Sequence, residues 1–168
     1  MDALLEKLQQ AITSALDGLS SEDLRRHTAG KWCAAEVLEH LFLTYTGTVK
    51  GFERVLEAGK PLVHPPTSRQ RLRSLVVVGL GYMPEGRKSP AAVQPRGLPA
   101  DLVRSQIGTK IVAMDEIIKR CEDTFGRRKK VLDHPILGPL TVGQWRKFHL
   151  VHGLHHVKQL HRLRLMRS

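Results

Sequence analysis

The sequence has only two cysteines, Cys33 and Cys121, among its 168 residues. They form no CxxC pair and no cluster at metal-ligand spacing, which fits a reducing compartment better than a disulfide scaffold. Residues 1–7 also lack the basic region and the apolar run with which a secretory signal begins. From both absences we expect a cytoplasmic protein.

Long apolar runs are missing as well. The longest, residues 75–83, is interrupted by glycines and is far shorter than the roughly 20 residues that span a bilayer, so no membrane association is expected. The sequence has no internal repeat, and neither a GxGxxG nor a P-loop pattern supports a nucleotide site. Because 41% of the residues are apolar and the length suits one core, we predict a single domain over residues 1–168.

Acidic residues are scarce in the carboxy-terminal part of the chain. Residues 61–168 hold 20 Lys and Arg against 7 Asp and Glu, no acidic residue follows Asp133, and the formal net charge is +11. This excess favours an anionic partner. Residues 127–130 form a short basic run, but such runs are usually solvated turns, and the docking motifs of nucleic-acid-binding proteins are missing. We therefore expect a small anionic substrate rather than a nucleic acid.

Apolar residues recur at intervals of three and four in four segments, which predicts four helices. We expect them at about residues 4–18, 34–58, 101–124 and 141–166, with Thr141 and Gln144 as the capping box of the last. Seven of the nine prolines fall in residues 61–100, which excludes a long regular helix there. Within this crossover, residues 71–80 are compatible with a short buried helix or an extended segment. The predicted fold class is all-α, with a long Pro-rich crossover between the second and third helices.

Histidines are concentrated near the carboxyl end, where five of the nine occur within thirteen residues. His152 and His156 are about 40° apart on one helical face, a spacing that lets two imidazoles bind one ion. His149 shares that face, whereas His155 lies at its edge and His161 on the far side. The spacing predicts a two-histidine clamp made by His152 and His156.

A third ligand must come from another helix, and His40 is the candidate because it lies in the apolar stretch of residues 37–43. The alternative is that His40 is a hydrogen-bonded core residue, as single histidines in amphipathic helices often are. His64 and His134, each next to a proline, are interpreted as structural or solvated.

Two motifs resemble the DinB-like metalloprotein superfamily. Residues 32–41 (WCAAEVLEHL) resemble its W-S-x-x-E-x-L-x-H-L helix opening, and residues 152–160 (HGLHHVKQL) resemble its closing H-x-x-H-H-x-x-Q helix. Residues 134–145 further resemble an uncharacterised branch. The resemblance implies an up-down four-helix bundle, frequent dimerisation, and one divalent metal ion held by His40, His152 and His156. The sequence departs from the pattern at Cys33, where serine is usual, and at residues 157–158, where many relatives have Arg-Gly.

Members of that superfamily include thiol S-transferases that use bacillithiol, mycothiol or glutathione. Three neutral imidazoles leave a coordination position open, and a water or thiol bound there loses its proton near neutral pH. Zinc is the expected ion by ligand type, although imidazole also binds nickel, iron and manganese. The resemblance thus implies a metal-dependent thiol S-transferase, a hydrolase or a related enzyme. The alternative is a non-catalytic metal-binding or metal-sensing bundle, and no general base beyond a metal-bound water is evident.

Small residues follow His40 on its own helical face. They indicate either a pocket above the metal or a close contact between helices, and close packing is the favoured interpretation. These residues are Thr44, Gly47, Thr48 and Gly51. The last helix is apolar on two faces, which predicts a homodimer or packing against the crossover.

Overall fold

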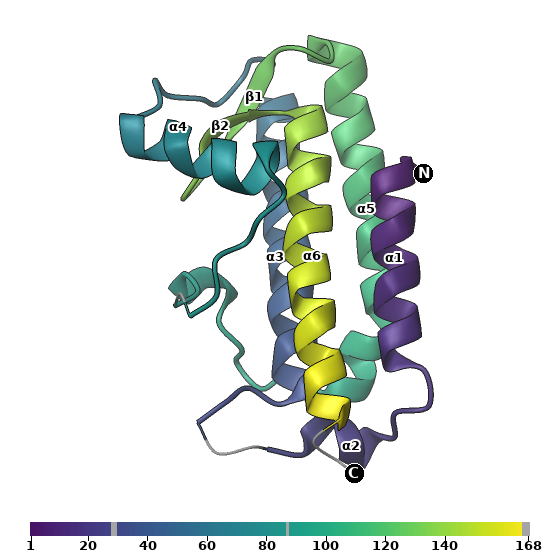
Figure 1. The fold of residues 1–168 in the computed structure, drawn as a ribbon. Helices are drawn as coiled ribbons and strands as arrows, with labels where there is room; N and C mark the ends of the chain where they lie inside the picture. Colours follow the sequence, from purple (N-terminus) through teal and green to yellow (C-terminus); the bar gives the residue numbers. More distant parts are fainter. Residues whose placement is uncertain (28–29, 87, 166–168) are drawn as a thin grey trace.

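The computed structural model describes residues 1–27, 30–86 and 88–165, and the fold is mainly α-helical (Figure 1). Four long helices lie side by side. They are α1 (Ala3–Leu16), α3 (Ala34–Glu57), α5 (Ala100–Phe125) and α6 (Val142–Leu165). The four predicted helices are thus confirmed, and the predicted end at Met166 lies outside the described residues. Two shorter helices, α2 (Ser21–Arg25) and α4 (Ser68–Ser74), complete the α-helices of the described residues.

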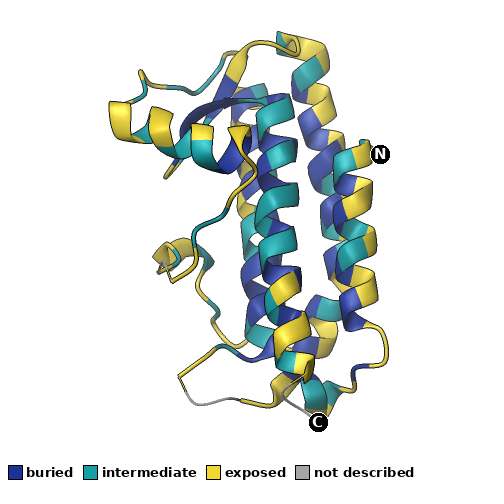
Figure 2. Cartoon of the chain, viewed as in Figure 1, coloured by how far each residue is buried: buried dark blue, intermediate teal, exposed yellow. Residues whose placement is uncertain are grey.

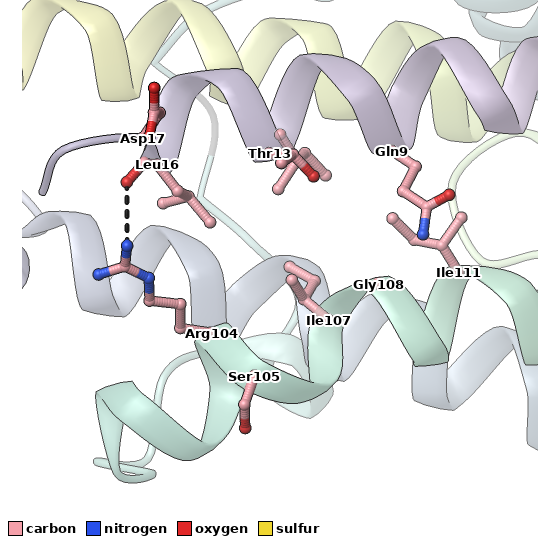
Figure 3. A pocket seen from close by; sticks show the side chains of 10 residues that line it. Gln9, Thr13, Leu16, Asp17, Arg104, Ser105, Ile107, Gly108 and Ile111 are labelled. Atoms are coloured by element: carbon pink, nitrogen blue, oxygen red, sulfur yellow. Dashed lines mark hydrogen bonds between the residues drawn. The ribbon is translucent and has the colours of Figure 1, made fainter.

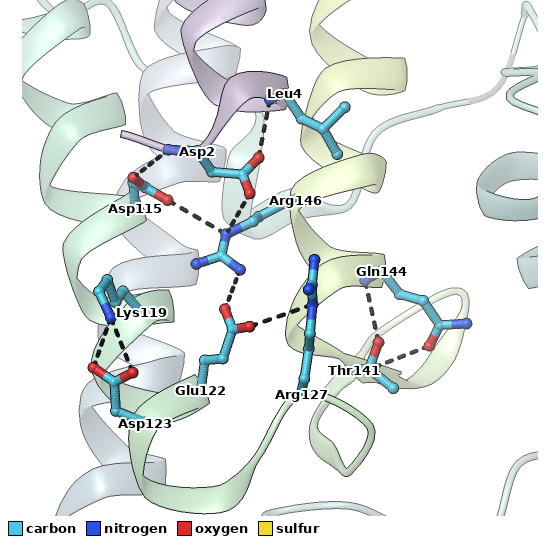
Figure 4. Close-up of polar contacts among 10 residues, drawn as sticks. All are labelled: Asp2, Leu4, Asp115, Lys119, Glu122, Asp123, Arg127, Thr141, Gln144 and Arg146. Carbon is cyan, nitrogen blue, oxygen red and sulfur yellow. Dashed lines mark hydrogen bonds and ion pairs between the residues drawn. The ribbon is translucent and has the colours of Figure 1, made fainter.

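The core lies between the long helices, whose buried faces turn toward one another (Figure 2). In α1 the buried Leu5, Leu8 and Ile12 recur at helical spacing, and α1 packs chiefly on α6 while α3 packs chiefly on α5. Thr141 and Gln144 form the predicted capping box at the start of α6 (Figure 4). No helix in the described part of the chain is both long and apolar enough to cross a membrane.

A buried arginine fixes the beginning of α6 against the neighbouring helices (Figure 4). The Arg146 side chain is 7% exposed and forms ion pairs with Asp2 (3.7 Å), Asp115 (3.4 Å) and Glu122. Asp2 is also the N-cap of α1, and its N–H donates to Asp115 at 2.9 Å. One guanidinium therefore connects α1, α5 and α6.

A small antiparallel hairpin departs from the all-α prediction. Strand β1 (Lys130–His134) pairs with β2 (Gly138–Thr141), and the tight turn between them places Gly138 at a φ of 74°. Strands of five and four residues are too short to leave a clear alternation in the sequence, which is why the prediction missed them. The hairpin is fastened to α6 by Trp145, whose Nε1–H donates to the Leu132 carbonyl at 3.2 Å.

The crossover between α3 and α5 is partly helical. After α4 the chain continues into a π-helical turn, η1 (Leu75–Gly79), that buries Val77 and Val78, so the helical alternative for this segment is the one the structure has. Further along, the crossover forms a 3-10 turn, η2 (Ala91–Val93), that packs on α3. The prolines exclude a long helix here, as predicted, and the segment instead wraps across the open side of α3 and α6 (Figure 1).

Candidate metal centre

The structure brings His40 of α3 together with His152 and His156 of α6. The Nε2 atoms of His40 and His152 are 3.1 Å apart, and those of His152 and His156 are also 3.1 Å apart. One ring nitrogen from each of the three lies within 4.8 Å of the others, so the cluster could hold a metal ion. These are the three histidines that the family resemblance implied as ligands.

Two of the three rings are oriented by acceptors on their far side. The Nδ1–H of His40 donates to the backbone carbonyl of Val93 at 2.8 Å, and the Nδ1–H of His156 donates to Gln159 Oε1 at 3.1 Å. Protons at Nδ1 leave the Nε2 lone pairs of both rings free to face the centre of the cluster. Such outer partners fix the tautomer and ring orientation of metal-binding histidines.

All three imidazoles are kept neutral by burial. Desolvation is the main cause that lowers the pKa of His40, lowers the pKa of His152 well below its ordinary value, and lowers the pKa of His156 to about 3. A histidine must be neutral to bind a metal. The cluster is therefore in the ligand-competent protonation state at neutral pH.

Aromatic rings hold the cluster in place from outside. Trp32 packs on His40 with ring centroids 5.3 Å apart, and Phe148 stacks on His152 at 5.4 Å with an interplanar angle of 12°. These contacts limit rotation of the imidazoles about their side-chain bonds.

A cavity of about 760 Å³ opens beside the three histidines. It lies between α3, α6, the hairpin and the crossover, and Thr44 and Gly47 line it directly above His40. A Cβ at Gly47 would meet no atom of the described residues within 4 Å, so the favoured interpretation of close packing is wrong there. It holds at Gly51, where a Cβ would lie 2.8 Å from Leu132 Cδ2.

The cavity carries unbalanced positive charge. Arg54, Arg69 and Arg73 line it, and none of them forms an ion pair within the described part of the chain. The acidic lining residue is Asp133, one of whose oxygens accepts hydrogen bonds from the backbone N–H and the Nδ1–H of His64 at 3.0 and 2.7 Å. The remaining walls are largely apolar, so the space suits an anion with a hydrocarbon portion.

Other histidines lie outside the three-histidine cluster. His149, on the ligand face of α6, is fully buried and contacts Thr48 Oγ1 through Nε2 at 3.1 Å instead of joining the cluster. His155 lines the cavity, and His161 is exposed, which agrees with its predicted place on the far side of the helix. His64 is exposed beside Asp133, in agreement with a solvated residue. His134 lines the cavity, a position that the sequence did not indicate.

Two other places were candidates for a site. His27, Cys33 and Glu36 could also approach one ion, but the Glu36 carboxylate already accepts the Cys33 backbone N–H at 2.8 Å. A groove of about 270 Å³ lies between α1 and α5 (Figure 3), and its Arg104 donates to the Leu16 carbonyl. None of the described residues that line this groove is a histidine or a cysteine. The three-histidine cluster is therefore the better candidate.

Fold and site together define a mainly helical protein with three neutral imidazoles at the edge of a basic, partly apolar cavity. A family model matches residues 1–163, and the chain belongs to that family, DUF1569, which is described as a protein of unknown function. No curated protein matches the chain, and no solved structure does.

Proposed function

We propose that this protein binds one divalent metal ion through His40, His152 and His156 and uses it to act on a small anionic substrate. The observation that carries the proposal is the convergence of three ring nitrogens, each within 4.8 Å of the others, at the edge of a cavity of about 760 Å³. Three protein ligands and an adjoining space leave a coordination position to a fourth group, as in catalytic rather than closed structural sites.

Zinc is the proposed ion because imidazole is among its usual ligands, and nickel, iron and manganese are the alternatives that the same donors accept. A bound divalent ion would act as a Lewis acid that lowers the pKa of a coordinated water or thiol. The protein's own part is to hold three neutral imidazoles in place. Val93 and Gln159 keep the protons of His40 and His156 on Nδ1, so that Nε2 stays available.

The cavity supports a substrate that is anionic and partly apolar. Arg54, Arg69 and Arg73 would attract and orient the negative charge, and the absence of ion-pair partners for them among the described residues leaves their donors free. A low-molecular-weight acidic thiol meets both requirements. We therefore propose a thiol S-transferase or a related enzyme, such as a hydrolase.

Membership of the DinB-like superfamily is part of the same proposal. The four long helices α1, α3, α5 and α6 are then an up-down four-helix bundle with its crossover between α3 and α5. The motif positions support this, since three of the four histidines that the two motifs share with that superfamily, His40, His152 and His156, meet in space. Cytoplasmic location and a homodimer stay predictions.

A non-catalytic role is the second candidate. Helices α3 and α6 contact each other much less than α3 contacts α5, so an ion held by His40, His152 and His156 would connect two weakly joined helices. A metal-binding or metal-sensing protein would need nothing more. The adjoining cavity favours the enzyme.

Metal content and activity test the two candidates. We expect about one divalent ion per chain in purified protein and its loss in His40→Ala, His152→Ala and His156→Ala, while His155→Ala and His161→Ala keep it. Transfer of bacillithiol, mycothiol or glutathione to an electrophile should then disappear when the metal is stripped and return when it is restored. Metal loss without any change in activity would contradict the enzyme, and absence of metal binding would contradict both candidates.

A further inference from the structure

His134, at the end of β1, has one ring nitrogen fully engaged by the backbone. Its Nδ1 accepts the N–H of Ile136 at 3.1 Å and the N–H of Leu137 at 3.2 Å. A ring turned over by 180° would set a C–H group against these two donors and lose both hydrogen bonds. The turn of the hairpin therefore selects one ring orientation.

This arrangement also selects the tautomer. Because Nδ1 accepts two hydrogen bonds, a neutral His134 carries its proton on Nε2. Burial lowers the pKa of His134 to about 4, so the ring is neutral at pH 7. His134 is thus a neutral imidazole whose Nε2–H is a hydrogen-bond donor.

The Nε2–H group belongs to a side chain that lines the cavity beside the three histidines. His134 lines that cavity, and within the described residues its Nε2 has no protein partner. In the described part of the chain, buried side-chain atoms without a hydrogen-bond partner occur on Tyr45, Asp133, His149 and His152. His134 Nε2 is not one of these buried atoms. It is a donor that a ligand in the cavity can reach.

Aromatic packing places this donor near the three-histidine cluster. The His134 ring contacts Trp145 at 5.3 Å and Phe148 at 4.4 Å between centroids, and the same Phe148 ring stacks on His152 at 5.4 Å. One phenyl ring therefore contacts both the donor and a candidate metal ligand. A small molecule in the cavity can face both at once.

We infer that the Nε2–H of His134 donates a hydrogen bond to an oxyanion, such as a carboxylate, on a ligand with an apolar body that occupies this cavity. The inference rests on the proposed function only in taking the cavity as the substrate site. A neutral donor is suited to this position because it needs no counter-charge when the cavity is empty, while the guanidinium groups of Arg54, Arg69 and Arg73 supply the attraction for the anion.

Two substitutions separate this role from the structural role of the same ring. In His134→Asn the amide oxygen can replace Nδ1 as acceptor for the turn, because asparagine commonly accepts backbone N–H groups two residues on, but no donor reaches the cavity. In His134→Gln the longer amide can present an N–H near the position of Nε2, while the turn acceptor is lost. His134→Asn thus keeps the acceptor for the turn without the donor, and His134→Gln keeps the donor without the acceptor.

Binding of hexanoate, measured by calorimetry with the protein both zinc-loaded and metal-free, provides the test. We expect saturable binding by the wild type, affinity within about threefold of wild type for His134→Gln, and a loss of about tenfold for His134→Asn. Hexan-1-ol, which has the same body without the carboxylate, should bind more weakly than hexanoate. In nitrogen-15 spectra of the ring, the Nε2–H signal of His134 should shift on hexanoate binding.

Several results would overturn the inference. These are no saturable hexanoate binding to either form, equal affinity of wild type and His134→Asn, or a loss in His134→Gln with retention in His134→Asn. The metal-free measurements keep this test apart from the proposed function. Failure to load zinc would contradict the metal-dependent function, while the response of hexanoate affinity to the two variants would still decide the role of His134.

Discussion

His40 in α3 is oriented by Val93 in η2, through a hydrogen bond of 2.8 Å from Nδ1–H to the backbone carbonyl. The crossover therefore takes part in the candidate metal centre. Its position depends on the residue before His40, because the buried Glu39 carboxylate accepts the N–H groups of Arg96, Gly97 and Leu98 at 2.6, 3.1 and 3.1 Å. Glu39 thus anchors the crossover, and the crossover in turn orients His40, the next residue of α3.

Substitution Glu39→Gln should weaken metal binding although Glu39 is not a ligand. The amide would turn one acceptor oxygen into a donor facing backbone N–H groups, so the crossover would shift and the Val93 carbonyl with it. We expect metal affinity to fall by about tenfold, as for other residues that orient a ligand, and the free energy of unfolding to fall by about 2 kcal/mol. Metal titration and urea unfolding measure the two effects. Exposed Glu53 lies in the same helix, and Glu53→Gln is the matched control that should change neither.

Stability of the metal-free protein should fall in mildly acidic solution. Burial lowers the pKa of His149 to about 3, whereas an unfolded histidine titrates near its ordinary value of 6.5. Between these values the unfolded chain binds the extra proton, so stability is fully present above pH 6.5 and declines as pH falls toward 3. From pH 6.5 to 5 this one residue should cost about 2 kcal/mol.

The variant His149→Leu tests that assignment. It removes the buried imidazole, so its loss of stability between pH 7 and pH 5 should be smaller than that of the wild type by about 2 kcal/mol. Urea unfolding at the two pH values measures the difference. The control is His161→Leu, which makes the same substitution at an exposed position of the same helix. Equal losses in wild type and His149→Leu would show that His149 does not titrate in the proposed way.

The sequence predicted those parts of the centre that depend on local geometry. His152 and His156 followed from four-residue spacing on one helix, which needs no knowledge of the rest of the chain. His40 needed the family resemblance, because a single histidine in an apolar helix has no distinguishing spacing. Val93 could not be found, since it contributes a backbone carbonyl that any residue would carry. The role proposed for His134 depends on how the hairpin turn closes, and the proline beside it in the sequence led only to the interpretation of a structural or solvated residue.

In the fold, too, the elements set by local sequence patterns were predicted and those set by distant contacts were not. Long periodic helices were predicted to within a few residues, and the capping box at Thr141 and Gln144 was identified because its two residues interact within one turn. The hairpin was missed, and α4 with η1 remained one of two alternatives. Both depend on burial against distant segments, such as the packing of the Leu132 side chain on Gly51, which no short window of sequence contains.

Arg146 should contribute far more to stability than an exposed arginine with a comparable ion pair. In Arg146→Met, the carboxylates of Asp2, Asp115 and Glu122 would remain close together without their shared cation. We expect a loss of about 3 kcal/mol in the free energy of unfolding. Arg162→Met, which removes an exposed pair with Glu85 at 3.1 Å, should cost much less because solvent screens that pair. Urea unfolding at neutral pH compares the two, and similar losses would contradict the structural role of Arg146.

Filling the cavity from α3 should separate metal binding from ligand binding. Gly47 lines the cavity, and a Cβ there meets no atom of the described residues within 4 Å. The Leu side chain of Gly47→Leu would therefore enter the cavity and improve the helix at the same time. We expect an unchanged metal content, an equal or higher melting temperature, and a loss of hexanoate binding and thiol transfer of at least about tenfold.

Gly51→Ala, one turn further along α3, is the contrasting variant. Its Cβ would lie 2.8 Å from Leu132 Cδ2, so it should lower stability by about 1–3 kcal/mol through overpacking. Undiminished hexanoate binding by a folded Gly47→Leu protein would place the ligand outside this cavity, and loss of the metal would mean that Gly47 supports the histidines rather than the space beside them.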